Sequence, residues 1–312
     1  MRRKLSVLLI IILSCYLLFN NLNIDSFAYV FEKRLFQLVA MFLISISISV
    51  STSIFQAITV NRILTPSIMG YDQLFVFIQT TIIFVLGSTN FIIVNPILNF
   101  ALSTTIIMIL SFFIFNWFLK NNKMSIFHLM LVGIIFSSFI NNMSRVIKTL
   151  LDPNDYLVVQ DISFASINNV EKDIVIVSSL LIIIILVLIF KKIKFLDVIQ
   201  QGKDISINLG INYQSFVYKL FMIISVLAAI STSLVGPILF LGFISINISK
   251  QINKTDNNKE ILIDTIIVSV ILVLVSFLIS LHVFNLMIPT SLFIDLLGGI
   301  YFMKIIFKGG RI

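Results

Sequence analysis

The stretch from Gln73 to Leu119 contains 47 residues without a formal charge. Folded as a single helix, it would extend ~70 Å, more than twice the ~30 Å thickness of the hydrocarbon core of a bilayer. The stretch must therefore cross a membrane twice, with the break at residues 87–90 and at Asn95–Pro96, where turn-forming residues gather. The chain is thus predicted to be an integral membrane protein.

Composition excludes the main soluble classes. Apolar residues make up 59% of the chain and charged residues 12%, about half the charged share of a soluble domain, so polar side chains are too few to cover a water-facing surface. One cysteine, Cys15, and two histidines, His128 and His282, cannot form a disulfide framework or a thiolate or histidine metal site. The net charge of +8 includes no basic tract with interleaved aromatic residues, so no nucleic-acid partner is expected.

The chain also lacks the motifs of an enzyme. It contains no phosphate-binding Gly-x-x-x-x-Gly-Lys loop and no histidine–acid cluster at the end of a span. No catalytic residue, metal ion or cofactor is therefore expected on this chain. If the protein pumps a substrate, ATP and Mg²⁺ must be bound by another subunit.

The same length argument divides residues 220–249 at Gly236–Pro237 into a full span and a short one. We predict an all-α fold of about ten transmembrane helices, which form a single domain over residues 1–312. The predicted spans are roughly 5–20, 35–57, 70–87, 97–119, 125–147, 173–190, 213–235, 237–249, 261–281 and 286–306.

One predicted span contains a pattern typical of a strand. Serine alternates with aliphatic residues over 44–51, as in a half-buried β-strand. However, residues 35–55 form an uncharged run far longer than the ~10 residues that a barrel strand needs. A helix is favoured, with serines that bond to their own backbone and permit close helix packing. The strand remains the alternative.

The distribution of charge predicts the orientation. With the N-terminus inside, cytoplasmic segments hold sixteen basic residues and the outer face holds five, so both termini are expected in the cytoplasm. Residues 2–4 before an apolar run resemble a signal peptide, and Ser14–Cys15 weakly resembles a lipoprotein cleavage site. No secreted domain follows, so a retained first helix is favoured.

Two connecting segments could meet partners. In residues 191–212, a short amphipathic helix is predicted to begin at Phe195, and Gly202 separates it from a second, which Gly210 ends. A soluble protein could dock on this compact platform, although an ordinary interfacial segment would look the same. The outer loop 149–172 is acidic, and could meet a basic surface or simply remain solvated.

Few ionisable residues lie inside the predicted spans. Asp295 lies within the last span, Asp72 near the inner end of the third, and Lys219 near the inner end of the seventh. An intramembrane carboxylate is costly and usually functional or paired. A proton-driven carrier would be expected to bury several such groups, and only Asp295 is predicted to lie deep. This weakens the alternative of an ion-coupled secondary transporter of a small organic solute.

Specific residues then favour one class of transporter. The run SIFQAITVNRILTPSIMGYD, residues 53–72, closely resembles the second-to-third-helix signature of iron-chelate permeases, the FecCD family of ABC importers. Residues 127–142, 202–210 and 298–302 resemble further family segments in the same order. The Asn-Arg-Ile-Leu-Thr-Pro-Ser form is similar to the branch for catecholate and petrobactin-type siderophores.

The resemblance implies a type II importer permease, similar to the vitamin B12 permease, in the bacterial plasma membrane. Two permease subunits would enclose the path, with a cytoplasmic ATPase dimer beneath them. The resemblance implies ATPase coupling through Leu196, Gly202, Leu209 and Gly210. A role in translocation or in the family's structural signature is expected for Asn61, Arg62, Pro66, Asp72 and Asp295.

The resemblance also implies that an extracytoplasmic siderophore-binding protein, typically a lipoprotein, docks on basic residues. Arg34 fills the first such position, but Gln37 replaces a second arginine and His282 replaces a basic residue near the ninth helix. Docking charge is therefore expected to be reduced and, through His282, pH-dependent. A homologous but different partner permease would supply the remaining charge.

Overall fold

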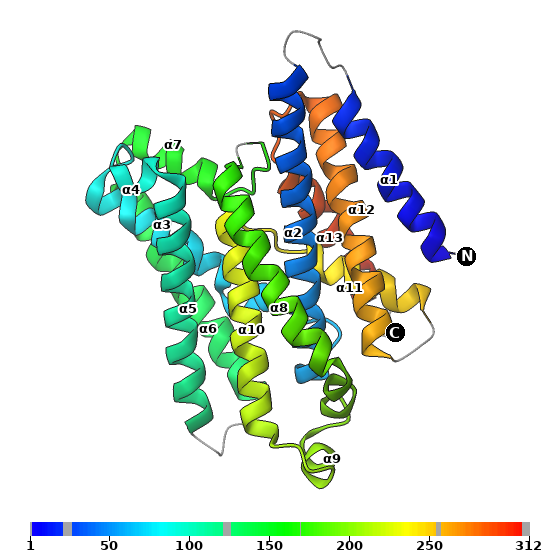
Figure 1. Cartoon of the computed structure of the whole chain (residues 1–312). Coiled ribbons are helices and arrows are strands. Elements are labelled where there is room, and N and C mark those ends of the chain that lie inside the picture. Colours follow the sequence, from blue (N-terminus) through cyan, green and yellow to red (C-terminus); the bar gives the residue numbers. More distant parts are fainter. Residues whose placement is uncertain (1, 21–26, 121–125, 169, 254–256, 308–312) are drawn as a thin grey trace.

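The computed structural model describes residues 2–20, 27–120, 126–168, 170–253 and 257–307, and these residues contain helices and no strand. Figure 1 shows the helices packed side by side. They are α1 (Arg2–Phe19), α2 (Phe27–Thr59), the 3-10 helix η2 (Pro66–Met69), α3 (Tyr71–Leu86), α4 (Phe91–Val94), α5 (Pro96–Lys120), α6 (Ile126–Leu150), α7 (Pro153–Ile162), α8 (Lys172–Ile199), α9 (Lys203–Asn208), α10 (Tyr213–Val235), α11 (Leu241–Ile252), α12 (Asn258–Phe284) and α13 (Thr290–Phe307).

Several helices can cross a membrane. Among the described residues, six stretches are long and apolar enough by length and composition: α2, residues 96–114 of α5, residues 130–150 of α6, α8, α10 and α12. The shorter helix α3 is also apolar. The prediction of an all-α, multi-pass membrane protein is confirmed.

Helix α2 includes the alternating serines of residues 44–51, so the strand alternative is wrong at this segment. The hydroxyl of Ser45 donates to the carbonyl of Met41 at 2.6 Å, and that of Ser49 donates to the carbonyl of Thr265 on α12 at 3.3 Å. Ser45 thus bonds to its own helix, as predicted, and Ser49 bonds to a neighbouring one, and such small side chains let neighbouring backbones approach.

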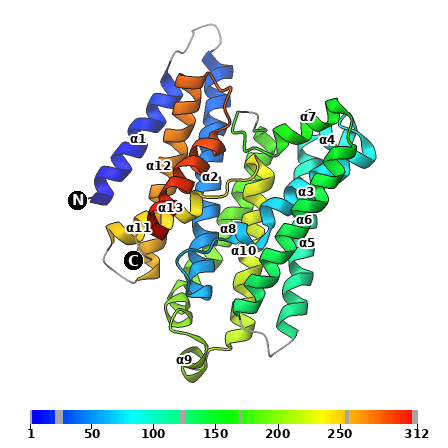
Figure 2. The same cartoon turned by 180° about the vertical axis from the view of Figure 1, so that it is seen from behind.

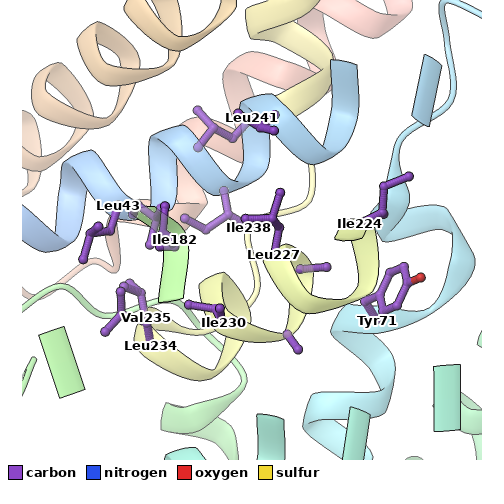
Figure 3. Close-up of a cluster of buried hydrophobic side chains, with 14 of the residues drawn as sticks. Leu43, Tyr71, Ile182, Ile224, Leu227, Ile230, Leu234, Val235, Ile238 and Leu241 are labelled. Carbon is purple, nitrogen blue, oxygen red and sulfur yellow. The ribbon is translucent and has the colours of Figure 1, made fainter. Parts of the chain in front are cut away.

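Helices α2 and α10 form the centre of the bundle. Helix α2 packs against α10, α12, α8 and α11, and α10 packs against α5 and α3 as well. Figure 3 shows part of this core: Ile224, Leu227, Ile230 and Leu234 of α10, Leu43 of α2 and Ile182 of α8. Since lipid tails are as apolar as these side chains, dense van der Waals packing is what holds the helices together here.

The two ends of the molecule differ. Figures 1 and 2 place α4 and α7 at one end of the bundle and α9 at the other. Helix α7 lies inside the predicted outer loop 149–172, where Pro153 at its first turn and Asp152 before it are typical helix-start residues. The predicted orientation would make the α7 end the outer one.

Several predicted boundaries differ from the structure; α2, for example, begins at Phe27 instead of residue 35. Helix α8 continues to Ile199, so no separate helix begins at Phe195. The helix is not interrupted there because it contains no glycine or proline, and because Ile193, Leu196 and Ile199 extend its buried face. Helix α11 begins at Leu241 instead of residue 237, because Gly236 has φ 106° and Pro237 follows it. Helix α13 begins at Thr290 instead of residue 286, directly after Pro289.

Candidate functional site

The site begins where the chain turns into the bundle before α3. Thr65 is extended, Pro66 starts η2, and Gly70 at φ 92° redirects the chain into α3. A Cβ on Gly70 would lie 3.1 Å from the Cα of Ser137 on α6, so glycine is needed both for this φ and for the close approach. As a result α3 begins level with the middle of α10, where the hydroxyls of Tyr71 and Ser225 are 2.8 Å apart.

This late start places Asp72 deep in the bundle. Its carboxylate is 6% exposed, and Oδ1 accepts a hydrogen bond of 3.2 Å from the hydroxyl of Thr232, near the C-terminal end of α10. The sequence had placed Asp72 near the inner edge of a span. The difference arises because η2 and Gly70 occupy the chain that would otherwise extend the helix toward that edge.

Asp295 caps the N-terminal end of the neighbouring helix α11. Its Oδ1 accepts a hydrogen bond of 3.1 Å from the backbone N–H of Phe240, the N-cap residue of α11. Helix α13 is close enough for this because Gly298 faces Phe240: a Cβ on Gly298 would lie 2.2 Å from the Cβ of Phe240. A carboxylate at a helix N-terminus satisfies orphan N–H groups and offsets the helix dipole. Asp295 therefore stabilises the break between α10 and α11.

These elements surround an open hollow in two parts, one of about 600 Å³ and one of about 510 Å³. Gln73, Asn141, Arg145 and Leu239 line both parts, so the two adjoin. We call the whole the polar hollow. It extends from the 63–68 segment, before α3, to Ser163 and Phe164, after α7.

Helix α6 gives the hollow its polar wall. Ser137, Ser138, Asn141, Asn142 and Arg145 recur at the three- and four-residue spacing of one helix face, and all line the hollow. A face with this many polar groups is costly against lipid, so it must face water or protein. The polar face of α6 therefore borders the hollow instead of facing lipid.

The segment 163–168, which we call the wedge, borders the hollow at the α7 end. Its Ser166 N–H donates to the carbonyl of Val235 at 2.8 Å, and its Ala165 N–H donates to the hydroxyl of Ser291 at 3.2 Å. Gln37, where an arginine was expected, is buried and donates to the carbonyl of Asn168 at 3.2 Å. The wedge is thus held by α10, α13 and α2.

The signature residues 61–66 fold the segment before α3. The carbonyl of Arg62 accepts from the side-chain amides of Gln56 at 2.7 Å and Asn247 at 3.3 Å. Asn61 accepts from the N–H of Ile63 at 2.9 Å, and Pro66 occupies the first turn of η2. These residues join α2 to α11.

The predicted coupling residues separate into buried and exposed ones. Leu196 is 2% exposed and packs within the bundle, whereas Leu209, the C-cap residue that follows the short helix α9, is 64% exposed. Gly202 and Gly210 bracket α9 with φ values of 105° and 80°. The buried hydroxyl of Ser206 donates to the carbonyls of Gly202 and Val198, which holds α9 against the end of α8.

The two predicted docking residues meet at the end of α1. The guanidinium of Arg34 donates to the carbonyls of Leu17, at 3.2 Å, and Asn20, and so caps the C-terminal end of α1. His282 Nε2 lies 3.2 Å from the side-chain nitrogen of the same Asn20, and its ring is 5.6 Å from that of Tyr16. Both residues therefore lie beside one helix end.

Sequence reasoning missed the position of Arg145 and Lys148, which it treated as charges of the outer face. Both line the polar hollow, and Lys148 donates to the hydroxyl of Ser163 in the wedge at 3.0 Å. The signal was present, because the two follow the serine and asparagine positions of α6 at helical spacing. Within the described residues, no group of three or more His, Cys, Asp or Glu side chains could hold a metal ion.

Known proteins share the sequence features and the fold of this chain. Residues 7–308 match the FecCD transport family. The chain is 34% identical to the petrobactin import system permease protein YclO of Bacillus subtilis, over 100% of this chain and 99% of that protein. It is 31% identical to the petrobactin import system permease protein FatC of Bacillus anthracis, over 95% of this chain and 85% of that protein. A metal-chelate type ABC transporter solved in an inward-facing conformation has the same fold, with a TM-score of 0.82, 17% identity and 97% of each chain covered.

Proposed function

Because the chain belongs to the FecCD transport family, we propose that it carries a ferric siderophore of the petrobactin type into a bacterium. It is a permease subunit of an ABC importer and not an enzyme, since ATP is hydrolysed by a separate ATPase. The observation that carries the proposal is similarity to two petrobactin permeases, over 100% and 95% of the chain. The polar hollow gives this function a physical path.

The alternative of an ion-coupled secondary carrier is not favoured. Asp72 and Asp295 are the carboxylates that line the hollow, and each accepts a hydrogen bond from another helix or a helix end. These bonds give both groups a structural role. Neither group is needed as a proton relay to explain its place in the membrane.

The ATPase dimer docks on the coupling segment, residues 191–212. Support comes from α9 and its C-cap residue, where Ile205, Ile207 and Leu209 are 47%, 49% and 64% exposed. Exposed aliphatic side chains on a helix fixed to the bundle suit a permanent protein contact. Leu209 and Gly210 are the contact candidates, and buried Leu196 acts by packing α8.

The siderophore-binding protein docks at the opposite end, near Arg34 and His282. Both side chains already contact the end of α1, so a bound partner would compete with or add to those contacts. A homologous second permease completes the transporter. Ten helices cross the plasma membrane, both termini lie in the cytoplasm, and ATP and Mg²⁺ are held by the ATPase.

Transport by the reconstituted importer tests this function. The chain is assembled in proteoliposomes with its partner permease, ATPase and binding protein, and uptake of ⁵⁵Fe-labelled petrobactin is measured. Uptake is expected to require both ATP and the loaded binding protein, and to persist when an ionophore removes proton and sodium gradients. Uptake that needs a gradient but no ATP would contradict the proposal.

A further inference from the structure

The polar hollow contains two cations that the general transport function does not explain. Arg145 and Lys148 lie on the same face of α6, three residues apart, and both line the hollow. We propose that they form an anion-binding subsite, which holds the negatively charged oxygen face of a ferric chelate during passage. This inference rests on the proposed function and deepens it by naming the charge class of the substrate.

Arg145 is the main element of the subsite. Its side chain is exposed, lines both parts of the hollow, and makes no hydrogen bond or ion pair with the rest of the described chain. An unpaired guanidinium directed at lipid would be strongly disfavoured, so this group requires water or an anionic ligand. Its planar fork of donors matches the paired oxygens of carboxylate and catecholate groups.

Lys148 supplies a second positive charge beside the wedge. Its ammonium group is half-buried and donates one hydrogen bond, 3.0 Å long, to the hydroxyl of Ser163. An ammonium has three N–H donors, so the bond to Ser163 leaves capacity for a ligand. The contact also fixes the lysine at the α7 end of the hollow, where the predicted orientation has substrate enter.

The carboxylates of the hollow do not cancel this charge. Asp72 is 6% exposed and accepts from Thr232, and Asp295 accepts from the N–H of Phe240. Each carboxylate thus has one oxygen engaged by a protein donor and lines only the smaller part of the hollow, whereas Arg145 lines both parts. The neutral amide of Asn141, one turn before Arg145, adds hydrogen-bonding groups without charge. Among the described residues, the 600 Å³ part of the hollow is lined by Arg145 and by no carboxylate, so the charge of that part is positive.

The test uses the complete importer in proteoliposomes with ⁵⁵Fe-labelled petrobactin as the probe. Uptake and ATPase activity stimulated by loaded binding protein are measured for Arg145→Glu, Arg145→Gln, Arg145→Lys and Lys148→Gln. The double variant Arg145→Gln/Asn141→Arg moves the charge by one turn along the same face. Lys172→Gln is the control, because Lys172 is an exposed cation paired with Glu32 outside the hollow.

Arg145→Glu is expected to lower uptake at limiting substrate by about tenfold or more, and Arg145→Gln and Lys148→Gln by a few-fold. Arg145→Lys and the double variant should recover most of the uptake, and stimulated ATPase activity should stay near that of the wild type. Equal uptake by wild type and Arg145→Glu would overturn the subsite. So would a parallel loss of ATPase activity in Arg145→Gln, or a failure of the double variant to recover. If the wild-type importer shows no ATP-dependent uptake of the chelate, the proposed function itself fails.

Discussion

Replacing Gly236 by alanine tests how tightly the wedge is held against the end of α10. The residue has φ 106° and ψ 177°, a region that alanine adopts only with strain. Its added Cβ would also lie 2.9 Å from the Cα of Ala165 and 3.1 Å from the carbonyl oxygen of Phe164. Gly236→Ala therefore combines backbone strain with a collision against the wedge.

Gly87 is a matched control for the strain alone. It follows α3 with φ 81° and ψ 156°. Its N–H donates to the carbonyl four residues earlier at 2.8 Å, as the N–H of Gly236 does. A Cβ added to Gly87 would meet nothing within 4 Å. Backbone strain is expected to cost about 1–3 kcal/mol at either site. The collision should add about 1–3 kcal/mol for Gly236→Ala, because overpacking forces neighbouring atoms to shift.

Equilibrium unfolding of the purified protein in mixed detergent, for example by a titration with SDS, measures the free energy of unfolding for both variants. Gly236→Ala should be the less stable by that difference of about 1–3 kcal/mol. Because the collision is with backbone atoms, Ala165→Gly should not rescue it. Equal destabilisation by the two alanines would refute the tight contact between the wedge and α10.

Three further predictions concern the two ends of the molecule. Arg3→Gln should lower the free energy of unfolding by about 1–2 kcal/mol, because Arg3 donates to both oxygens of Asp264 at 2.6 and 2.9 Å. Lys4→Gln is the control, and equal free energies of unfolding for the two variants would contradict a stabilising role of the Arg3–Asp264 pair. Leu209→Asp should lower uptake and stimulated ATPase activity together by about tenfold without loss of stability, and normal activity would argue against α9 as the ATPase contact. The importer with His282→Arg should take up substrate equally fast at pH 6 and pH 7.5, and the importer with His282→Ala should take it up more slowly at both pH values. Identical uptake by the two variants would rule out a docking role for His282.

The long helices were predictable because each contains a long apolar run with few charges, and residues 35–57 and 213–235 lie within α2 and α10. What the sequence did not yield are features set by contacts between distant residues. The wedge is fixed by Val235, Ser291 and Gln37, and no local pattern in residues 163–168 indicates those partners. The depth of Asp72 likewise follows from the conformation of Gly70, which a span count cannot give.

The polar hollow was partly predictable. Asp295 was identified as an intramembrane carboxylate, but its role as a cap for α11 depends on the approach of Gly298 to Phe240. The polar face of α6 follows a period that can be seen in the sequence. Arg145 and Lys148 lie at one end of it, where a positive charge is usually assigned to a loop.

Helix α8 connects the two regions to which we assign function. It begins at Lys172, shortly after the wedge, and runs without glycine or proline to Ile199, where Ser206 holds α9 against its end. An uninterrupted helix of this length, ~42 Å, moves as a stiff body over most of the bilayer. Asp197, in its last turn, also accepts from the side chain of Asn258 at 2.8 Å, which ties the same end to α12. We therefore expect a displacement of α9 to shift α8 and α12 together, and to reach the hollow through the wedge.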